Sequence, residues 1–507
     1  MLSKILSSAV IGIDGYTVNV EVDLSNGFPA FEIVGLPGSA VKESKERVRT
    51  AIKNAGFSIP AQRITINLAP ADIRKEGPSF DLPIALGLLV CMGIVEQKNL
   101  ENVLVIGELS LDGNLNSVSG VLPMIYNSYT KGISKCIIPY ANADEAALVE
   151  NAEVYPAKSL SQIIAFLSGK ESISRHIVNT KELFSNSCTE NTADFSDVKG
   201  QAYVKRAMEI AASGYHNILL SGHPGTGKTM LAKRLPSILP DLTFEESIDI
   251  TKIYSVSGLL KNSSSLITSR PFRSPHHTTS AAALTGGSKI PKPGEISLSH
   301  YGVLFLDELP EFKRNVLESL RQPMEDGQVT ISRVNGTITY PSKFMFVAAM
   351  NPCPCGYLGD TRCHCTASEI SKYKGRISGP LMDRIDIYIE TPDVTYSDLN
   401  SAEVCETSAE IKKRVTATRN VQLARYKNEG IFFNSQLSPK QTTKYCILEK
   451  NAQDFVKTAF ESLNLSARAY HKILKISRTI ADMDGSDIIK LEHTAEAMQY
   501  RGYVNNL

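Results

Sequence analysis

The sequence lacks the features that mark a membrane protein, a secreted protein or a strongly charged one. No apolar run is long enough to cross a bilayer and the first residues show no secretory leader, so we expect a cytoplasmic protein without membrane contact. The 54 Lys+Arg and 53 Asp+Glu residues leave a net charge of +1. A polyanionic partner would therefore be held by local basic patches and not by the field of the whole chain.

Cysteine is also sparse: nine residues, most of them scattered, are typical of a protein in a reducing compartment. The hydrophobic content of 42% is ordinary for a globular protein. A chain of 507 residues is too long for one hydrophobic core, so roughly two to four domains are expected.

A glycine-rich segment stands between an apolar run, 217–221, and residues 230–235, which predict the first turns of a helix. In this strand–turn–helix context the pattern G-x-x-x-x-G-K-[ST] indicates a phosphate site, because backbone N–H groups and the helix N-terminus surround an anion. The lysine reaches the β- and γ-phosphates of ATP, and the threonine hydroxyl binds Mg²⁺. The segment comprises Gly222, His223, Pro224, Gly225, Thr226, Gly227, Lys228 and Thr229.

Two later apolar strands end in polar side chains that would complete an ATPase site. Residues 303–306 precede Asp307 and Glu308, which match a Walker B motif: the first acid would join the Mg²⁺ shell and the second would activate water. Residues 344–350 end at Asn351, which is expected beside the γ-phosphate. Taken alone, two acids at a strand end can be surface charges, and an asparagine there can be a turn former.

Arginines in the second half of the chain are candidates for stabilising transition-state charge. Arg384 lies in the segment 378–386 and could reach the nucleotide of a neighbouring subunit, with Arg376 as the competing choice. Arg468 opens a late helix and would act on the γ-phosphate from a helical lid. A surface ion pair is the more common role of any single arginine.

The first 167 residues predict a mixed domain of the α+β kind. Residues 75–79 and 131–139 resemble the Lon-type protease domain, in which the serine at the position of Ser79 is a nucleophile paired with a lysine. Here Leu122 or Pro123 occupies the place of that lysine. A serine without a base is a poor nucleophile. We therefore interpret Ser79 as a helix N-cap or turn residue and expect no peptidase activity.

Together these motifs resemble the YifB/ComM family of magnesium-chelatase-like AAA+ ATPases over essentially the whole chain. The resemblance implies a multidomain α/β fold: a Lon-protease/ribosomal-S5-like α+β domain, a P-loop core with a parallel sheet, and a helical lid. The three domains are expected, in this order, at residues 1–167, 194–392 and 393–507, with a linker at 168–193. The resemblance further implies a homo-hexameric ring that binds ATP and Mg²⁺ between subunits and moves branched DNA during recombination, with Asn351 as sensor 1 and Arg468 as sensor 2.

Two insertions in the core are candidates for DNA contact. The segment 270–295 corresponds to the helix-2 insertion of the resembling family, and residues 328–340 alternate around Asn-Gly, a strong hairpin signal. Lys289, Lys292 and Arg333 near their tips could bind phosphates, or they could be solvated loop charges. The adjacent His276 and His277 lack a ligand partner at metal spacing, so we assign them a structural or interface role.

Two C-x-C pairs, Cys353/Cys355 and Cys363/Cys365, flank a short glycine-containing loop. Four thiolates at this spacing can close a structural tetrahedral Zn²⁺ site. His364 is a possible substitute ligand, and two disulfides or reduced thiols are the alternatives.

From residue 391 onward the chain predicts helices at 408–426, 438–443, 452–463, 467–483 and 491–501, which would form the lid. In the helix at 467–483 we expect Lys472, Lys475 and Arg478 to form a solvated face. The function expected overall is an ATP-driven DNA motor. The alternative is a remodeller of a protein complex, as in magnesium chelatase itself.

Overall fold

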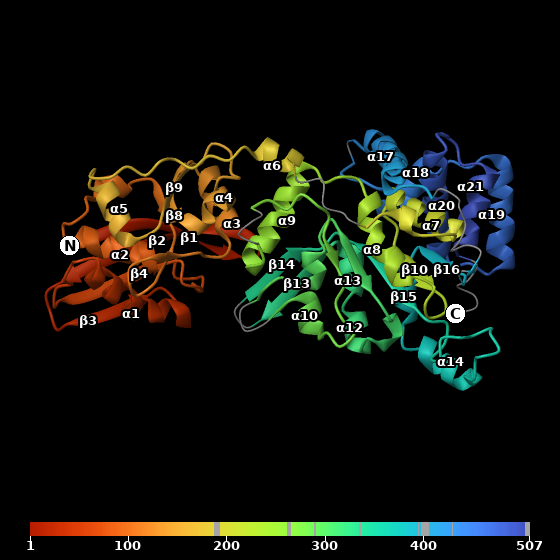
Figure 1. Ribbon diagram of the computed structural model, residues 1–507, viewed down its shortest axis with the longest axis horizontal. Coiled ribbons are helices and arrows are strands. Elements are labelled where there is room, and N and C mark those ends of the chain that lie inside the picture. The colour runs from red at the N-terminus through yellow and green to blue at the C-terminus, as the bar shows by residue number, and fades with distance from the viewer. Residues whose placement is uncertain are drawn as a thin grey trace.

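The computed structural model describes residues 1–186, 193–260, 265–287, 291–333, 336–393, 395–396, 405–427 and 429–501. The molecule is elongated: the N-terminal residues form one end, the middle of the chain fills the centre, and C-terminal helices form the other end (Figure 1). The fold is mixed α/β and contains a parallel sheet, as predicted. No helix within the described ranges is long and apolar enough to cross a membrane.

A seven-stranded mixed sheet organises the N-terminal end, in the order β3-β4-β2-β1-β5-β8-β9. Alternate valines of β2 are buried, and the fully buried helix α2 packs against β1 and β2. The strands are β1 (Leu2–Ile11), β2 (Asp14–Ser25), β3 (Ala30–Val34), β4 (Arg63–Ala69), β5 (Val103–Val105), β8 (Lys135–Pro139) and β9 (Glu153–Ala157), with a separate ribbon of β6 (Glu108–Leu109) and β7 (Leu115–Asn116). The helices are α1 (Ser39–Asn54), α2 (Asp81–Cys91), α3 (Val121–Thr130), α4 (Ala143–Ala146), α5 (Leu160–Leu167) and α6 (Thr180–Asn186).

Ser79 is a turn residue and not the N-cap of α2. That helix begins after Phe80, and no side chain caps it. The Ser79 carbonyl instead accepts a hydrogen bond from the Gly107 amide at 3.0 Å. The Gly107 carbonyl in turn accepts from the Leu82 amide at 3.0 Å, so the chain after β5 is bonded to the start of α2.

The centre of the molecule contains a five-stranded parallel sheet in the order β11-β12-β15-β10-β16. Leu306 pairs with Ala348 and Ser221 with Met350, so the carboxyl ends of β12, β15 and β10 lie side by side. The strands are β10 (Ile218–Ser221), β11 (Phe272–Arg273), β12 (Val303–Leu306), β15 (Met345–Met350) and β16 (Ile387–Glu390). The helices are α7 (Ala202–Gly214), α8 (Lys228–Ile238), α9 (Phe244–Ser257), α10 (Ala281–Thr285), α11 (Glu295–Leu298), α12 (Arg314–Glu318), α13 (Arg321–Asp326), α14 (Ala367–Lys374) and α15 (Gly379–Met382). The expected hairpin is formed by β13 (Gln328–Arg333) and β14 (Gly336–Pro341).

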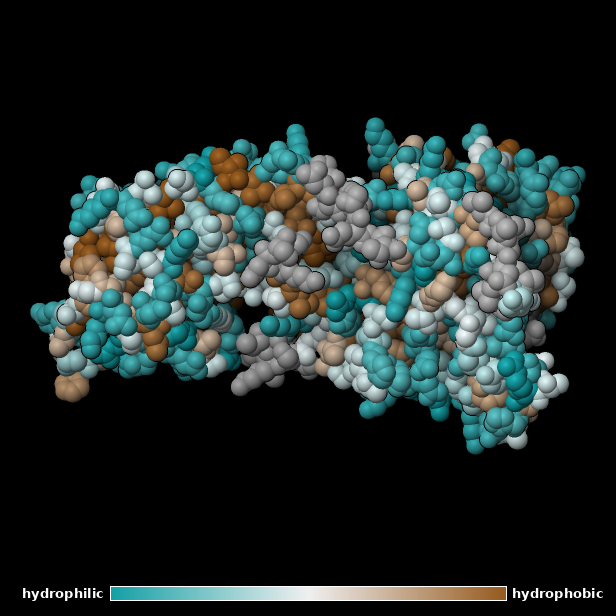
Figure 2. Space-filling model, in the orientation of Figure 1, coloured by the Kyte–Doolittle hydropathy of each residue, from teal (hydrophilic) through white to brown (hydrophobic). Residues whose placement is uncertain are grey.

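Helices α3 and α9 join the N-terminal end to the centre (Figure 1). The Gly120 amide donates to the Ser255 carbonyl at 3.2 Å across this junction, and the rings of Phe184 on α6 and Phe244 on α9 meet edge to face. In the space-filling view, apolar side chains gather over α6 and α9, whereas most of the remaining visible face is hydrophilic (Figure 2).

The C-terminal helices are α17 (Ser408–Arg425), α18 (Pro439–Tyr445), α19 (Lys450–Ser462), α20 (Ala467–Met483) and α21 (Leu491–Gln499). The prediction of a solvated basic face on α20 is wrong. Arg478 is 1% exposed and its guanidinium lies 3.0 Å from Asp482. The Lys472 ammonium lies 3.0 Å from Asp386, and that of Lys475 donates to the Ser435 carbonyl at 2.9 Å. The helix packs against α7, α17 and α21, so its cations are enclosed and satisfied by internal partners.

Candidate functional site

The glycine-rich segment forms a tight loop between β10 and α8. Gly225 and Gly227 have φ values of 85° and 84°, a left-handed conformation that glycine adopts without a steric penalty. Helix α8 begins at Lys228, directly after this turn. The positive end of α8 and the amides of the loop therefore face the same hollow, which is the arrangement that binds phosphate.

Lys228 is buried and lies across its own loop. Its Nζ donates to the carbonyls of Gly222 and His223, both at 2.7 Å, and to Oδ1 of Asn351 at 3.3 Å. Burial lowers the pKa of Lys228. The ammonium group is thus paired with neutral oxygens that phosphate oxygens can replace.

Thr229 and Asp307, the two residues predicted to bind magnesium, are in direct contact. Oγ1 of Thr229 donates to Oδ2 of Asp307 at 2.6 Å, and Oδ1 of the same carboxylate accepts from the Glu308 amide at 3.0 Å. Hydroxyl and carboxylate oxygens are the ligands that Mg²⁺ prefers. The parallel register of β10, β15 and β12 brings these two residues, which are 78 positions apart, to one edge of the sheet.

Glu308 has a φ of 52°, and its side chain is 57% exposed. Its Oε2 lies 3.5 Å from Nδ1 of His277, the residue to which the sequence had suggested only a structural or interface role. No spacing rule links two residues 31 positions apart on different elements, so this contact had no sequence signal.

His223, within the phosphate loop, contacts the carboxylate of Asp393 through Nδ1 at 3.0 Å. This hydrogen bond raises the pKa of His223. Asp393 follows β16, so the end of this strand also supports the loop.

The candidate arginines are paired with acids outside the phosphate loop. Arg384 forms an ion pair with Glu325, and Arg468 lies 3.9 Å from Asp383; both arginines line one shared cavity. Arg376, the competing candidate, pairs with Glu311 at 2.8 Å. Neither Arg384 nor Arg468 lines the cavity beside the phosphate loop.

The four clustered cysteines converge. The ligand atoms of Cys353, Cys355, Cys363 and Cys365 all lie within 4.8 Å of one another. Sulfur–sulfur distances of 3.4, 3.7 and 3.9 Å exclude the two disulfides in this structure, because bonded sulfurs are about 2.05 Å apart. They match the edge of a tetrahedron with Zn–S bonds of about 2.3 Å, which is about 3.8 Å long. We call residues 353–365 the cysteine loop.

The candidate DNA contacts are only partly described. Lys292 is exposed, and its carbonyl accepts from the Gly287 amide at 3.2 Å. Lys289 lies outside the described residues. Arg333 ends β13, where it pairs with Gly336, but its side chain is outside the described part of the structure.

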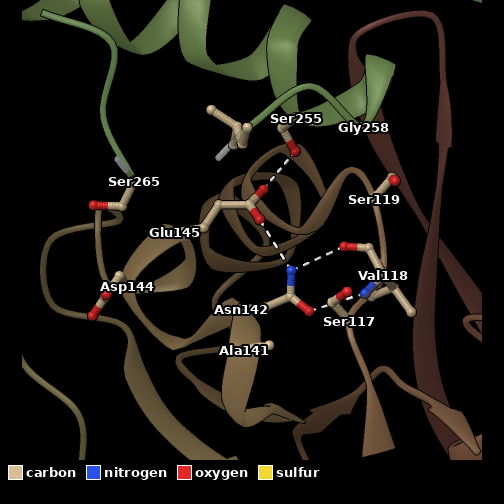
Figure 3. Close-up of a pocket in the computed structure, with 11 residues that line it drawn as sticks. Ser117, Val118, Ser119, Ala141, Asn142, Asp144, Glu145, Ser255, Gly258 and Ser265 are labelled. Carbon is tan, nitrogen blue, oxygen red and sulfur yellow. Dashed lines mark hydrogen bonds between the residues drawn. The ribbon is translucent and has the colours of Figure 1, made fainter. Parts of the chain in front are cut away.

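A second, smaller cavity of about 120 Å³ lies where the N-terminal end meets α9 (Figure 3). The buried Glu145 carboxylate accepts hydrogen bonds from Ser255 Oγ, the Leu122 amide at 2.8 Å and Asn142 Nδ2 at 3.2 Å. Burial raises the pKa of Glu145, although these hydrogen bonds oppose the effect. The contact with Ser255 joins the two parts of the chain through a side chain.

Comparison with known proteins places the whole chain among magnesium-chelatase-like sequences. Three family models match: "Subunit ChlI of Mg-chelatase" over 20–142, "Magnesium chelatase, subunit ChlI" over 194–399, and "Magnesium chelatase, subunit ChlI C-terminal" over 405–501. Competence protein ComM of Haemophilus influenzae is 45% identical, with 100% of this chain and 98% of that protein covered.

Two further relatives differ in how much they cover. The uncharacterized protein YifB of Salmonella typhimurium is 42% identical, over 99% of this chain and 97% of that protein. Lon protease 2 of Bacillus subtilis is 30% identical over 128 residues only, 25% of this chain and 22% of that protein.

Proposed function

Because the chain belongs to the ComM/YifB family of magnesium-chelatase-like proteins, we propose that it is an ATP-hydrolysing motor that acts on branched DNA. The observation that carries the proposal is the hydrogen bond between Thr229 and Asp307, which joins the phosphate loop to the acidic strand end. A relative named a competence protein supports a competence-related role.

The residues of the site have distinct roles in this proposal. Lys228 exchanges its carbonyl partners for phosphate oxygens, and the loop amides from Gly222 to Gly227 orient the phosphates. Thr229 and Asp307 hold Mg²⁺, which neutralises charge on the phosphates when bound. Glu308 takes a proton from the attacking water, and Asn351 orients that water.

We further propose that hydrolysis requires a ring of identical chains, because Arg384 and Arg468 line a different cavity from the one beside the phosphate loop. Arg384 and Arg468 line one cavity and would approach the γ-phosphate of a neighbouring subunit. Each nucleotide then lies between two chains. In the same ring, Arg333, Lys289 and Lys292 would contact DNA phosphates at the tips of the two insertions.

The proposal also gives each part of the chain a separate role. Residues 1–167 form a Lon-protease-like unit that is catalytically inactive, since Leu122 or Pro123 stands in place of the lysine that a serine nucleophile needs. Residues 194–392 form the ATPase core and 393–507 the lid, joined to the first unit by 168–193. The cysteine loop holds Zn²⁺ as a structural ion.

A second candidate function is the remodelling of a protein complex, as performed by a magnesium chelatase. The three family models, all named for a magnesium-chelatase subunit, favour it. Both functions require ATP hydrolysis, so they differ in the substrate on which the protein acts: DNA in one case and a protein complex in the other.

The test is the rate of phosphate release with different activators at matched concentration. We expect forked or three-stranded DNA to raise the rate at least about tenfold over the basal rate and over unbranched duplex. A strand-displacement assay with labelled three-stranded DNA should then show ATP-dependent product. A rate unaffected by any DNA, with no displaced strand, would contradict the DNA function and leave the remodelling function.

A further inference from the structure

The cysteine loop lies directly against the phosphate loop. The Leu358 carbonyl is 3.4 Å from Nε2 of His223, and the rings of His223 and Tyr357 are 5.9 Å apart. Gly356 has a φ of 89°, and a Cβ there would lie 2.6 Å from Cγ of Pro224. The two loops therefore pack with no space for a larger residue at this point.

The cysteine loop also lines the cavity beside the phosphate loop. This cavity, of about 440 Å³, is bounded by residues 223–227 on one side and by apolar side chains such as Val198 and Leu231 on another. Tyr357 and Arg362 of the cysteine loop complete its lining, whereas the paired acids of the site do not reach it. Its size and mixed lining suit a small organic ligand. It borders both the phosphate loop and the first turn of α8.

Tyr357 and Arg362 form a planar pair at this cavity. The guanidinium carbon of Arg362 lies 4.2 Å from the centre of the Tyr357 ring. Two hydrogen bonds from the same guanidinium to Asp360, at 2.8 and 3.0 Å, fix its orientation. A flat aromatic and cationic surface stacks well on a nucleobase or binds a ribose.

We propose that the cysteine loop is a nucleotide-binding element whose Tyr357 and Arg362 contact the nucleoside of ATP, and that a metal ion on its four cysteines holds these two residues in place. The inference rests on the proposed function, because it assumes that the phosphate loop binds ATP. It adds that the affinity for ATP depends on metal occupancy, although none of the four cysteines lines the cavity.

The nucleoside contact is tested by calorimetric titration of the full chain with Mg²⁺-ATP and, separately, with Mg²⁺-tripolyphosphate. We expect Tyr357→Ala and Arg362→Ala to weaken ATP binding about tenfold and leave tripolyphosphate binding unchanged. Lys372→Gln, an exposed charge on α14 that does not line the cavity, should change neither.

If the two variants lost affinity for ATP and tripolyphosphate equally, or lost affinity for neither ligand, the proposed nucleoside contact would be overturned. If the wild-type chain bound tripolyphosphate and ATP equally well, the inference would fail and the phosphate site would stand. If it bound neither, both the inference and the proposed function would fall.

The metal dependence is tested on the same chain after removal of zinc with a chelator and after its return. We expect the zinc-free chain to bind ATP about tenfold more weakly, to keep its affinity for tripolyphosphate, and to recover when one zinc per chain is restored. Unchanged ATP affinity in zinc-free protein, or failure of the cysteine loop to take up zinc at all, would overturn the proposed dependence of ATP binding on the metal.

Discussion

At the scale of single residues, the sequence predicted which side chains meet at the phosphate loop but not the contacts that surround them. The phosphate loop and the paired acids follow a spacing rule, so Lys228 and Asp307 could be identified from the chain alone. The bonds from the lysine to two carbonyls of the phosphate loop and the approach of His277 to Glu308 depend on rotamers and on distant segments, which no local pattern encodes.

Glu308→Gln should bind ATP with near wild-type affinity and release phosphate about 10²- to 10⁴-fold more slowly, because the amide cannot accept a proton from water. Nucleotide titration and phosphate release on the same preparation measure the two effects. Glu461→Gln, an exposed residue of α19, is the matched control. A turnover number for Glu308→Gln close to that of the control would refute its role as base.

The contact between His223 and Asp393 makes a prediction about pH. The hydrogen bond raises the pKa of His223 in the folded state. Its stabilising contribution is therefore complete below the ordinary histidine pKa and is lost as the pH rises through the raised value. Asp393→Asn should lower the pKa of His223, followed by NMR titration of the imidazole; a titration unmoved by the substitution would show that the carboxylate does not act on the ring.

At the scale of elements, the strands that lead into the site residues, the hairpin and the helices of the C-terminal end were predicted, whereas many short helices such as α10 to α15 were not. The interpretation of α20 failed for a physical reason. Its cations lie on a helix that other helices surround, and a sequence does not reveal which faces a neighbour covers. Arg478 is held by Asp482 and by the carbonyl of Asp487 at 2.7 Å, so a charged residue became part of the interior.

Arg478→Met should destabilise the helical region by about 3–5 kcal/mol, because it removes one partner of a buried ion pair and leaves carbonyl oxygens unsatisfied. Native-state hydrogen exchange of the α20 amides measures the loss locally. Arg468→Met, on the same helix but 68% exposed, should cost no more than about 1 kcal/mol. If the α20 amides were equally protected from hydrogen exchange in the two variants, the buried ion-pair network would contribute little to stability.

The cysteine loop predicts about one zinc per chain in protein purified without chelator. Elemental analysis measures this, and Cys363→Ser should lower the zinc content severalfold while Cys446→Ser, a buried cysteine remote in sequence, should not. Less than one metal per several chains in the wild type would remove the zinc assignment. The cysteine spacing predicted the cluster; its packing against the phosphate loop is a tertiary contact that the spacing could not indicate.

At the scale of the whole molecule, the nucleotide pocket and the arginines occupy different places on one elongated chain. The parallel sheet and the general α/β architecture follow from the sequence, but this separation becomes visible only in three dimensions. It leads to the central claim that a single chain carries both halves of an active site and can complete neither alone.

The most direct test is the rate of phosphate release by a mixture of two inactive variants. Lys228→Ala lacks the phosphate contact and keeps its arginines, whereas Arg384→Ala keeps its pocket and lacks the arginine. Each of these two variants should be inactive on its own. Arg376→Ala, which alters the competing candidate arginine, is the comparison variant. When they are mixed into one ring, roughly one quarter of the interfaces should combine an intact pocket with an intact arginine, and activity should return in that proportion. A mixed ring as inactive as its components, or an Arg384→Ala variant with full activity, would contradict the account.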